Sequence, residues 1–207
     1  MPALLQDIMA NRQTISTRKG PIEITIDGDA KAPACLLIHG GMGGIDQSAL
    51  LGTAAIAPAL SFRKIALSRL GYLGTPLSSG QSPEKQADLF AHLLDELQIE
   101  KTAVMAISAG GPSAIAFAAR HQDRCAALIL VSCCTTLLPI KRAIRMRLAL
   151  MNLMARAPKM VDWMRKRAEQ DPLKTARRSI SDPEALGRVV ADAEAWPLLQ
   201  GLAKQPV

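Results

Sequence analysis

The residue with the clearest chemical potential is Ser108, in the stretch AISAG at residues 106–110. An apolar run ends just before this serine, and a segment rich in small residues follows it. A nucleophilic serine at a sharp strand-to-helix turn needs small residues two positions before and after it, and Ala106 and Gly110 meet that need. The following helix would point free N–H groups and its positive dipole end at the serine, so the N–H of Ala109 is a candidate oxyanion donor. An ordinary turn with a capping serine has the same pattern.

A glycine-rich loop follows another apolar run, with the sequence HGGMGG at residues 39–44. Glycines after a buried strand allow the backbone to approach a ligand closely. A free N–H in this loop, that of Gly41, would supply the second oxyanion donor. A tight strand-to-helix turn and a phosphate loop are the alternatives. A phosphate loop would need a following lysine or a G-x-G-x-x-G frame, and neither is present.

Serine needs a neighbouring base to act as a nucleophile at neutral pH, and the sequence shows none. His39 belongs to the glycine-rich loop, His92 to a predicted helix, and His121 to the end of the helix after Ser108. Each of these contexts favours a structural role. The carboxylates that follow Ser108 in helical or capping contexts are Asp182, Glu184, Asp192 and Glu194. We therefore assign no triad acid and find no triad histidine.

The elements that must position these residues form an alternating pattern. Four apolar runs predict neighbouring strands of a parallel sheet: Ala34–His39, Lys64–Ser68, Thr102–Ile107 and Cys125–Ser132. Helices are predicted over residues 46–60, from Ser82-Pro83 onward, and over Pro112–His121. Two β-branched runs at residues 14–18 and 22–26 predict strands joined by a turn. The expected fold class is α/β, a doubly wound and mainly parallel sheet flanked by helices.

The pattern changes after Cys134. Residues 137–170 hold five of the nine methionines, interleaved with Arg and Lys, and we expect them to be mostly helical. Residues 141–178 contain 12 basic and 3 acidic side chains, whereas residues 1–140 contain 11 of each. Such a patch can attract phosphates, anionic lipid or acidic partners, although a solvated helix face has the same composition. We therefore expect a core of residues 1–136 and a helical, cap-like segment of residues 137–207.

Over about residues 13–135 the chain resembles the α/β-hydrolase family. The similarity rests on the HGG loop, KIALSRLGYLGTP, SPEKQADLFAHLLDELQIEK, AISAGGPSAIAFAARH and CAALILVS, in this order and spacing. The resemblance implies that Ser108 is the nucleophile, that Gly41 and Ala109 form the oxyanion hole, and that the segment after residue 135 is the cap over the pocket. The family's acid and histidine follow later strands. The chain thus resembles a C-terminally truncated member, with the last strands of the fold missing.

Two functions are compatible with this resemblance. The first is a serine hydrolase acting on a small apolar acyl substrate, such as an ester or amide, and incomplete in this chain. The alternative is a non-catalytic binding or interaction module that keeps the elbow without the base. A third hypothesis is a surface-associated, lipase-like protein that docks through residues 141–167.

Other features restrict the cofactors and partners. Nothing in the sequence indicates an organic cofactor or a metal. The cysteines at positions 35, 125, 133 and 134 lack ligand spacing and fit reduced thiols of a cytoplasmic protein. No apolar run reaches the roughly 18 residues of a membrane span, and no nucleic-acid partner is expected. In the family, further strands pair beyond Cys125–Ser132, so we expect this strand to be an exposed apolar edge that favours self-association.

Overall fold

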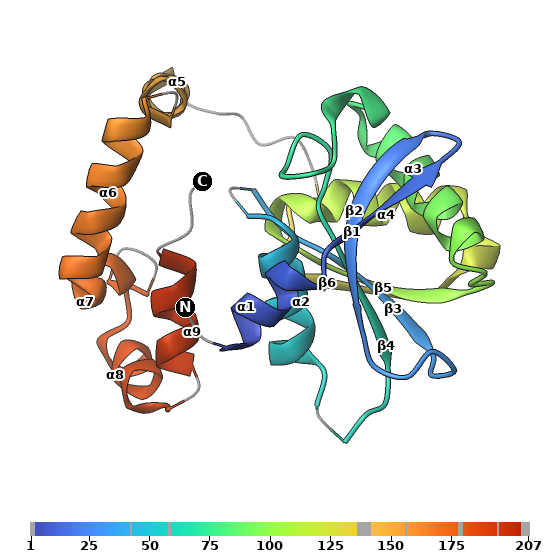
Figure 1. The fold of residues 1–207 in the computed structure, drawn as a ribbon, viewed down its shortest axis with the longest axis horizontal. Coiled ribbons are helices and arrows are strands. Elements are labelled where there is room, and N and C mark those ends of the chain that lie inside the picture. The colour runs from blue at the N-terminus through green and yellow to red at the C-terminus, as the bar shows by residue number, and fades with distance from the viewer. Residues whose placement is uncertain are drawn as a thin grey trace. The chain divides into compact units, whose positions relative to one another are not determined.

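The structure, a computed structural model, describes residues 3–41, 43–57, 59–135, 142–155, 157–177, 180–193 and 195–203. It divides into a core unit, Asp7–Leu138, and a second unit made of Met1–Gln6 and Pro139–Val207. The core contains the β-sheet, and the second unit contains most of the helices drawn in orange and red in Figure 1. The division into a hydrolase core and a cap as functional domains stays a prediction.

The core is built on a six-stranded sheet with the order β1-β2-β4-β3-β5-β6. Its strands are β1 (Gln13–Thr17), β2 (Gly20–Asp27), β3 (Ala34–Ile38), β4 (Arg63–Leu67), β5 (Thr102–Ile107) and β6 (Cys125–Val131). The hairpin β1–β2 is antiparallel, and β2 also pairs antiparallel with β4. The strands β4, β3, β5 and β6 are parallel neighbours. The predicted parallel sheet is therefore confirmed, and the predicted pair of short strands extends it beyond β4.

Helices cover both faces of this sheet (Figure 1). Helix α2 (Ile45–Ala55) lies on one face, and α3 (Pro83–Glu96) and α4 (Gly111–Arg120) lie on the other. The alternation of side chains along β3 explains both layers. Leu36 and Ile38 pack in the cluster that contains α3 and α4, whereas Cys35 and Leu37 pack in the cluster that contains α2. Both faces of the strand are thus apolar, as its uninterrupted run predicted.

The helix boundaries follow local signals. The side chain of Ser82 accepts a hydrogen bond from the N–H of Lys85 at 3.3 Å, and Pro83 is the first residue of α3. Helix α2 ends at Ala55, earlier than the predicted residue 60, because Ile56 is extended and a proline at position 58 disfavours helix just before it. The short elements are α1 (Ala3–Ala10), η1 (Leu77–Ser79), η2 (Ser108–Gly110) and η3 (Gln122–Arg124).

The regular secondary structure described in the second unit consists of helices. It contains α5 (Arg142–Ala155), α6 (Pro158–Gln170), α7 (Pro172–Ala176), α8 (Pro183–Ala191) and α9 (Ala195–Ala203). The helical character expected for residues 137–170 is found in α5 and α6, while residues 137–141 and 156 lie outside the described residues. The cap role of this unit stays a prediction. Among the described residues, no helix is both long and apolar enough to cross a membrane.

Strand β6 lies at one edge of the sheet, and within the described part of the chain its pairing partner is β5. Leu128, Ile129 and Leu130 are 37%, 38% and 37% exposed, whereas the side chains of β3 are all buried. Since successive side chains point to opposite faces of a sheet, both faces of β6 are partly exposed. The expected exposed apolar edge is therefore present.

Candidate active site

Ser108 lies at a sharp reversal of the chain between β5 and α4. Its backbone φ is +52°, a left-handed conformation that residues with a Cβ seldom adopt. Ile107 before it is still extended, with φ −118° and ψ 140°, so the change of direction falls on the serine, which is exposed. No side chain caps η2 or α4. Ser108 is therefore not the capping serine of an ordinary turn, and its strained backbone is typical of residues held in place for function.

The elbow and the glycine-rich loop meet because β3 and β5 are adjacent and parallel, so their carboxyl ends lie together. A Cβ on Gly40 would lie 3.0 Å from the Cβ of Ser108, and a Cβ on Gly110 would lie 2.7 Å from the carbonyl oxygen of His39. At these distances a larger residue at either position would force backbone movement. Glycine at positions 40 and 110 thus allows two loops to approach each other beside the serine.

The predicted oxyanion donors belong to these two loops. A Cβ on Gly41 would lie 3.8 Å from the Cβ of Ala109, so the two residues are in van der Waals reach. Neither N–H has an acceptor among the turn and loop hydrogen bonds between described residues. The arrangement suits two backbone N–H groups that stabilise negative charge on an oxygen beside Ser108.

His39 holds the glycine-rich loop and is fully buried. Its Nε2 accepts the N–H of Arg69 at 2.8 Å, so Nδ1 carries the proton and donates to the carbonyl oxygen of Gly40 at 2.8 Å. The pKa of His39 is lowered from 6.5 to about 4, mainly because the ring is buried. The hydrogen bond to Gly40 opposes this shift, and the nearby charge of Arg69 adds to it. His39 is therefore neutral at physiological pH and has no nitrogen lone pair free to accept a proton from Ser108.

Two residues that sequence reasoning missed support the same loop. The Oε1 of Gln47 accepts the N–H of Gly40 at 2.8 Å, and the guanidinium of Arg69 is 3.5 Å from the Gly40 carbonyl oxygen. Arg69 could have been found, because it directly follows a predicted strand at the sheet edge where the loops gather. Gln47 lies inside a helix and has no comparable signal.

A buried carboxylate, Glu23 on β2, anchors the loop that carries Arg69. Its side chain is 8% exposed. It accepts hydrogen bonds from the hydroxyl of Ser68 and from the N–H of Gly74, and its Oε1 is 3.2 Å from Nη1 of Arg12. The Glu23 N–H also donates to Oγ1 of Thr75 at 2.9 Å. Glu23 thereby fixes both ends of the segment from residue 68 to residue 75.

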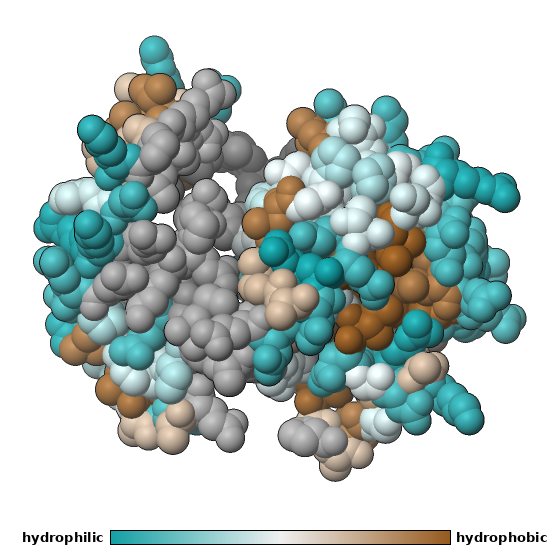
Figure 2. Space-filling model, in the orientation of Figure 1, coloured by the Kyte–Doolittle hydropathy of each residue, from teal (hydrophilic) through white to brown (hydrophobic). Residues whose placement is uncertain are grey.

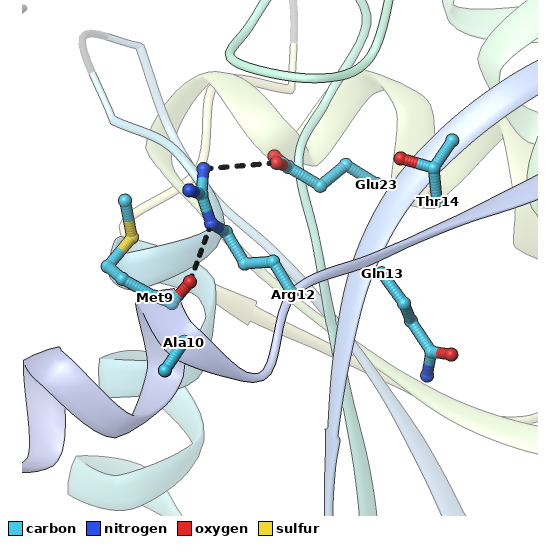
Figure 3. Close-up of a pocket in the computed structure, with 6 residues that line it drawn as sticks. All are labelled: Met9, Ala10, Arg12, Gln13, Thr14 and Glu23. Carbon is cyan, nitrogen blue, oxygen red and sulfur yellow. Dashed lines mark hydrogen bonds and ion pairs between the residues drawn. The ribbon is translucent and has the colours of Figure 1, made fainter.

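This segment also carries Tyr72, whose ring meets the ring of His39 edge-on with centroids 4.7 Å apart. Glu23 is therefore connected to the glycine-rich loop through two successive sets of contacts. A hollow of about 320 Å³ lies beside Glu23. Figure 3 shows its lining residues, Met9, Ala10, Arg12, Gln13, Thr14 and Glu23. The guanidinium of Arg12 bridges the Met9 carbonyl oxygen and Glu23 there, so the charges of this pair are already satisfied. We assign no ligand to the hollow.

The other two histidines are paired elsewhere. Nε2 of His121 is 3.0 Å from Oδ1 of Asp88, a carboxyl whose pKa is lowered mainly by the hydrogen bond from Arg120. His121 follows the ten residues of α4, a helix about 15 Å long at 1.5 Å per residue, which separates it from the elbow at the other end. His92 pairs with Asp95 on its own helix at 3.5 Å.

The later carboxylates serve the helices of the second unit. Asp182 caps α8 by accepting the N–H of Glu184 at 3.0 Å, and Asp192 accepts the N–H of Ala195 at 2.8 Å. Glu184 pairs with Arg188 at 3.1 Å, while Glu194 lies outside the described residues. Between the described residues, no hydrogen bond joins the Ser108 hydroxyl to a histidine or carboxylate.

The architecture of this chain is similar to that of known proteins. The family model described as the alpha/beta hydrolase fold matches residues 33–197. The chain belongs to this family. The six-stranded, mainly parallel sheet agrees with this fold, and the family expected from the sequence is confirmed.

Individual members give the extent of the similarity. The alpha/beta hydrolase fold protein from Nakamurella multipartita is 30% identical, with a TM-score of 0.64 over 93% of this chain and 67% of that one. The uncharacterized hydrolase YcgS of Bacillus subtilis (strain 168) is 38% identical over 124 residues, which are 59% of this chain. The chain spans only 42% of that relative's length. Epoxide hydrolase A from Mycobacterium thermoresistibile, 19% identical with a TM-score of 0.56 over 93% of this chain and 70% of its own, shares the fold.

The first prediction concerns the pH dependence of stability in this hydrolase-fold chain. His39 titrates near 6.5 when unfolded and near 4 when folded, so the unfolded chain binds more protons between these values. The contribution of His39 to the free energy of unfolding is complete above about pH 6.5. As the pH falls toward 4 this contribution is lost, which lowers the free energy of unfolding by about 3 kcal/mol. In urea denaturation, His39→Gln should lose less unfolding free energy than the wild type over this range. His92→Gln should retain the wild-type slope, and equal slopes for all three proteins would contradict the prediction.

The second prediction concerns Glu23. In Glu23→Gln the carboxylate becomes an amide, whose N–H₂ group cannot accept the hydrogen bonds that Ser68 and Gly74 now donate. The ion pair with Arg12 would also be lost. We expect the free energy of unfolding to fall by about 1–3 kcal/mol. Amide hydrogen exchange should also become faster in residues 39–41 and 68–75. The matched variant Glu96→Gln alters an exposed carboxylate and should change stability by less than about 0.5 kcal/mol. Unchanged exchange in both segments would disprove the connection between Glu23 and the glycine-rich loop.

Proposed function

We propose that this chain carries the nucleophile and oxyanion hole of a serine hydrolase acting on a small apolar ester, amide or related acyl substrate. Membership of the alpha/beta hydrolase fold family and the similarity to hydrolases support hydrolytic chemistry. The observation that carries the proposal is the left-handed Ser108 at the contact between the elbow and the glycine-rich loop. The four free cysteines fit the cytoplasmic location that we propose with it.

In this mechanism the Ser108 hydroxyl oxygen attacks the substrate's carbonyl carbon, and the carbonyl oxygen becomes negatively charged. The N–H groups of Gly41 and Ala109 stabilise that oxyanion, each contributing a factor on the order of 10²–10³ in rate. The tetrahedral intermediate then releases the alcohol or amine and leaves the acyl group on Ser108. A water molecule hydrolyses this ester and regenerates the serine.

The proton of Ser108 needs an acceptor, and the described residues offer none. His39 uses both ring nitrogens in the loop, and His121 lies at the far end of α4. All three histidines of the sequence lie among the described residues, so the missing base is not a histidine of these 207 residues. We therefore expect the 207-residue chain by itself to show little or no turnover of simple esters.

The third prediction uses imidazole in place of the missing base. With a fluorophosphonate probe, the Ser108 oxygen bonds to phosphorus, fluoride leaves, and imidazole accepts the serine proton. We expect slow labelling of the wild type without imidazole and at least about tenfold faster labelling with it, since a positioned base typically contributes 10²–10⁴. Intact-protein mass spectrometry measures the adduct. Ser108→Ala should show no such increase, whereas the exposed-strand control Ser16→Ala should behave as the wild type.

Two other outcomes of these assays would contradict the proposal that Ser108 is a nucleophile without a base. Ser108-dependent turnover of a nitrophenyl ester at about 1–10³ s⁻¹ without imidazole would show that a base is already present. Labelling that never depends on Ser108, even with imidazole, would favour the alternative of a non-catalytic binding or interaction module. That alternative is supported by one observation, the absence of a base hydrogen-bonded to Ser108 among the described residues.

We also propose that the isolated chain self-associates through β6. An edge strand presents unpaired N–H and C=O groups, and on β6 these are flanked by exposed Leu128, Ile129 and Leu130. Pairing with a second strand would satisfy those groups and cover apolar surface on both faces.

The fourth prediction tests this edge by sedimentation at about 50 µM, where interfaces of modest affinity are populated. The wild type should form dimers or larger species, and Ile129→Lys should shift the distribution toward the monomer because charge on an edge strand opposes pairing. Leu60→Lys places the same charge at another exposed apolar position, outside β6, and should leave association unchanged. A cleanly monomeric wild type would contradict the proposal.

A further inference from the structure

Helix α5 exposes large apolar side chains next to arginines. Met146, Leu150 and Leu153 are 65%, 56% and 65% exposed, and their spacing of four and three residues places them on one helix face. Arg142 and Arg145 are also exposed at the start of this helix. The helix contains three arginines and no acidic residue.

Helix α6 repeats this combination. Lys159, Met160 and Trp163 are exposed, as are Lys166 and Arg167 one turn beyond the tryptophan. The guanidinium of Arg167 lies over the Trp163 ring at 5.2 Å from its centroid. Asp162 is exposed on the same helix, but α6 as a whole has four basic and two acidic residues.

We call these exposed residues the α5–α6 surface: Arg142, Arg145, Met146, Leu150 and Leu153 from α5, and Lys159, Met160, Trp163, Lys166 and Arg167 from α6. Figure 2 shows hydrophobic and hydrophilic side chains together over α5, and mainly hydrophilic ones over α6. Exposed groups of large apolar side chains mark interaction sites more often than inert surface. A partner for this surface must supply negative charge and an apolar environment together.

We infer that the α5–α6 surface docks on an anionic lipid bilayer. Lipid phosphates complement the arginines and lysines, and the boundary between headgroups and acyl chains accepts the leucine and methionine side chains. Tryptophan is favoured at this boundary because its ring is apolar and its N–H is polar. Nucleic acid would satisfy the positive charge but would leave Leu150 and Leu153 in water.

The geometry of docking follows from helix length. Helices α5 and α6 have 14 and 13 residues, and neither can cross a bilayer. They would therefore lie along the surface, with the apolar side chains inserted and the basic side chains at headgroup level. This inference does not rest on Ser108 or on the proposed hydrolase activity.

The fifth prediction is that the full chain binds anionic vesicles, and it is tested by flotation in a density gradient. Vesicle-bound protein floats, whereas self-associated protein stays at the bottom of the gradient. The full chain should float with vesicles of equal parts phosphatidylglycerol and phosphatidylcholine, and should not float with phosphatidylcholine alone. High salt should weaken this binding. Equal flotation with both vesicle types, or with neither, would overturn the inference.

Paired variants test the basic and the apolar side chains of the α5–α6 surface separately. Arg145→Glu with Lys166→Glu should lower vesicle affinity by at least about tenfold, since each basic residue near the membrane contributes on the order of 1 kcal/mol. Leu150→Ser with Trp163→Ser should lower it to a similar extent by removing inserted side chains. The control pair Arg18→Glu with Lys101→Glu changes exposed charges of the core and should bind as the wild type. Circular dichroism checks that each variant keeps its helices, and a control pair that loses as much affinity as the surface pairs would overturn the assignment.

A second measurement reports on Trp163 directly. In a Trp196→Phe background Trp163 is the single tryptophan, and its emission should shift to shorter wavelength on addition of anionic vesicles. An unchanged emission with bound vesicles would overturn its placement at the membrane. If the chain binds duplex DNA but no vesicles, and the Leu150→Ser/Trp163→Ser variant retains that DNA binding, the partner is a nucleic acid and the lipid inference is wrong.

Discussion

The site depends on one close approach, that of the turn after β3 to the elbow after β5. The two strands are parallel neighbours, and the last residues of their pairing, Ile38 and Ala106, bring both turns to the same place. A left-handed residue with a Cβ costs on the order of 1–3 kcal/mol, so the surrounding structure must enforce the backbone of Ser108. The turn after β3 lies close against the elbow, since a Cβ on Gly110 would lie only 2.7 Å from the carbonyl oxygen of His39. The strain is therefore supported by the sheet itself.

Buried polar groups transmit this support from the sheet to the loop. The neutral ring of His39 can join two backbone segments because one nitrogen donates and the other accepts, and protonation would remove the acceptor that Arg69 needs. Glu23 acts one step further away, by holding the segment on which Arg69 lies. An unsatisfied buried polar group costs more than its hydrogen bond contributes, so each member of this network fixes the next. The same contacts thereby stabilise the core and position the predicted oxyanion donors.

The features that the sequence predicted correctly are those encoded in local patterns. An uninterrupted apolar run such as residues 34–38 indicates a strand buried on both faces, and Ser82 followed by Pro83 indicates a helix start. Glu23 could not be identified in this way, because in the alternating run IEITI it resembles a solvent-facing residue of an edge strand. Its role depends on Ser68 and Gly74, which are 45 and 51 residues away. Contacts at that separation follow from the folded topology and leave no local pattern.

The two parts of the proposed chemistry also differ in what the fold alone supplies. Oxyanion stabilisation uses backbone N–H groups whose positions follow from the strand order, and these are available once the core has folded. Proton transfer needs one side chain at one distance from Ser108, and strand order alone does not supply it. A chain can therefore keep a strained elbow and a neighbouring glycine-rich loop, which its core packing maintains, whether or not a base lies beside the serine.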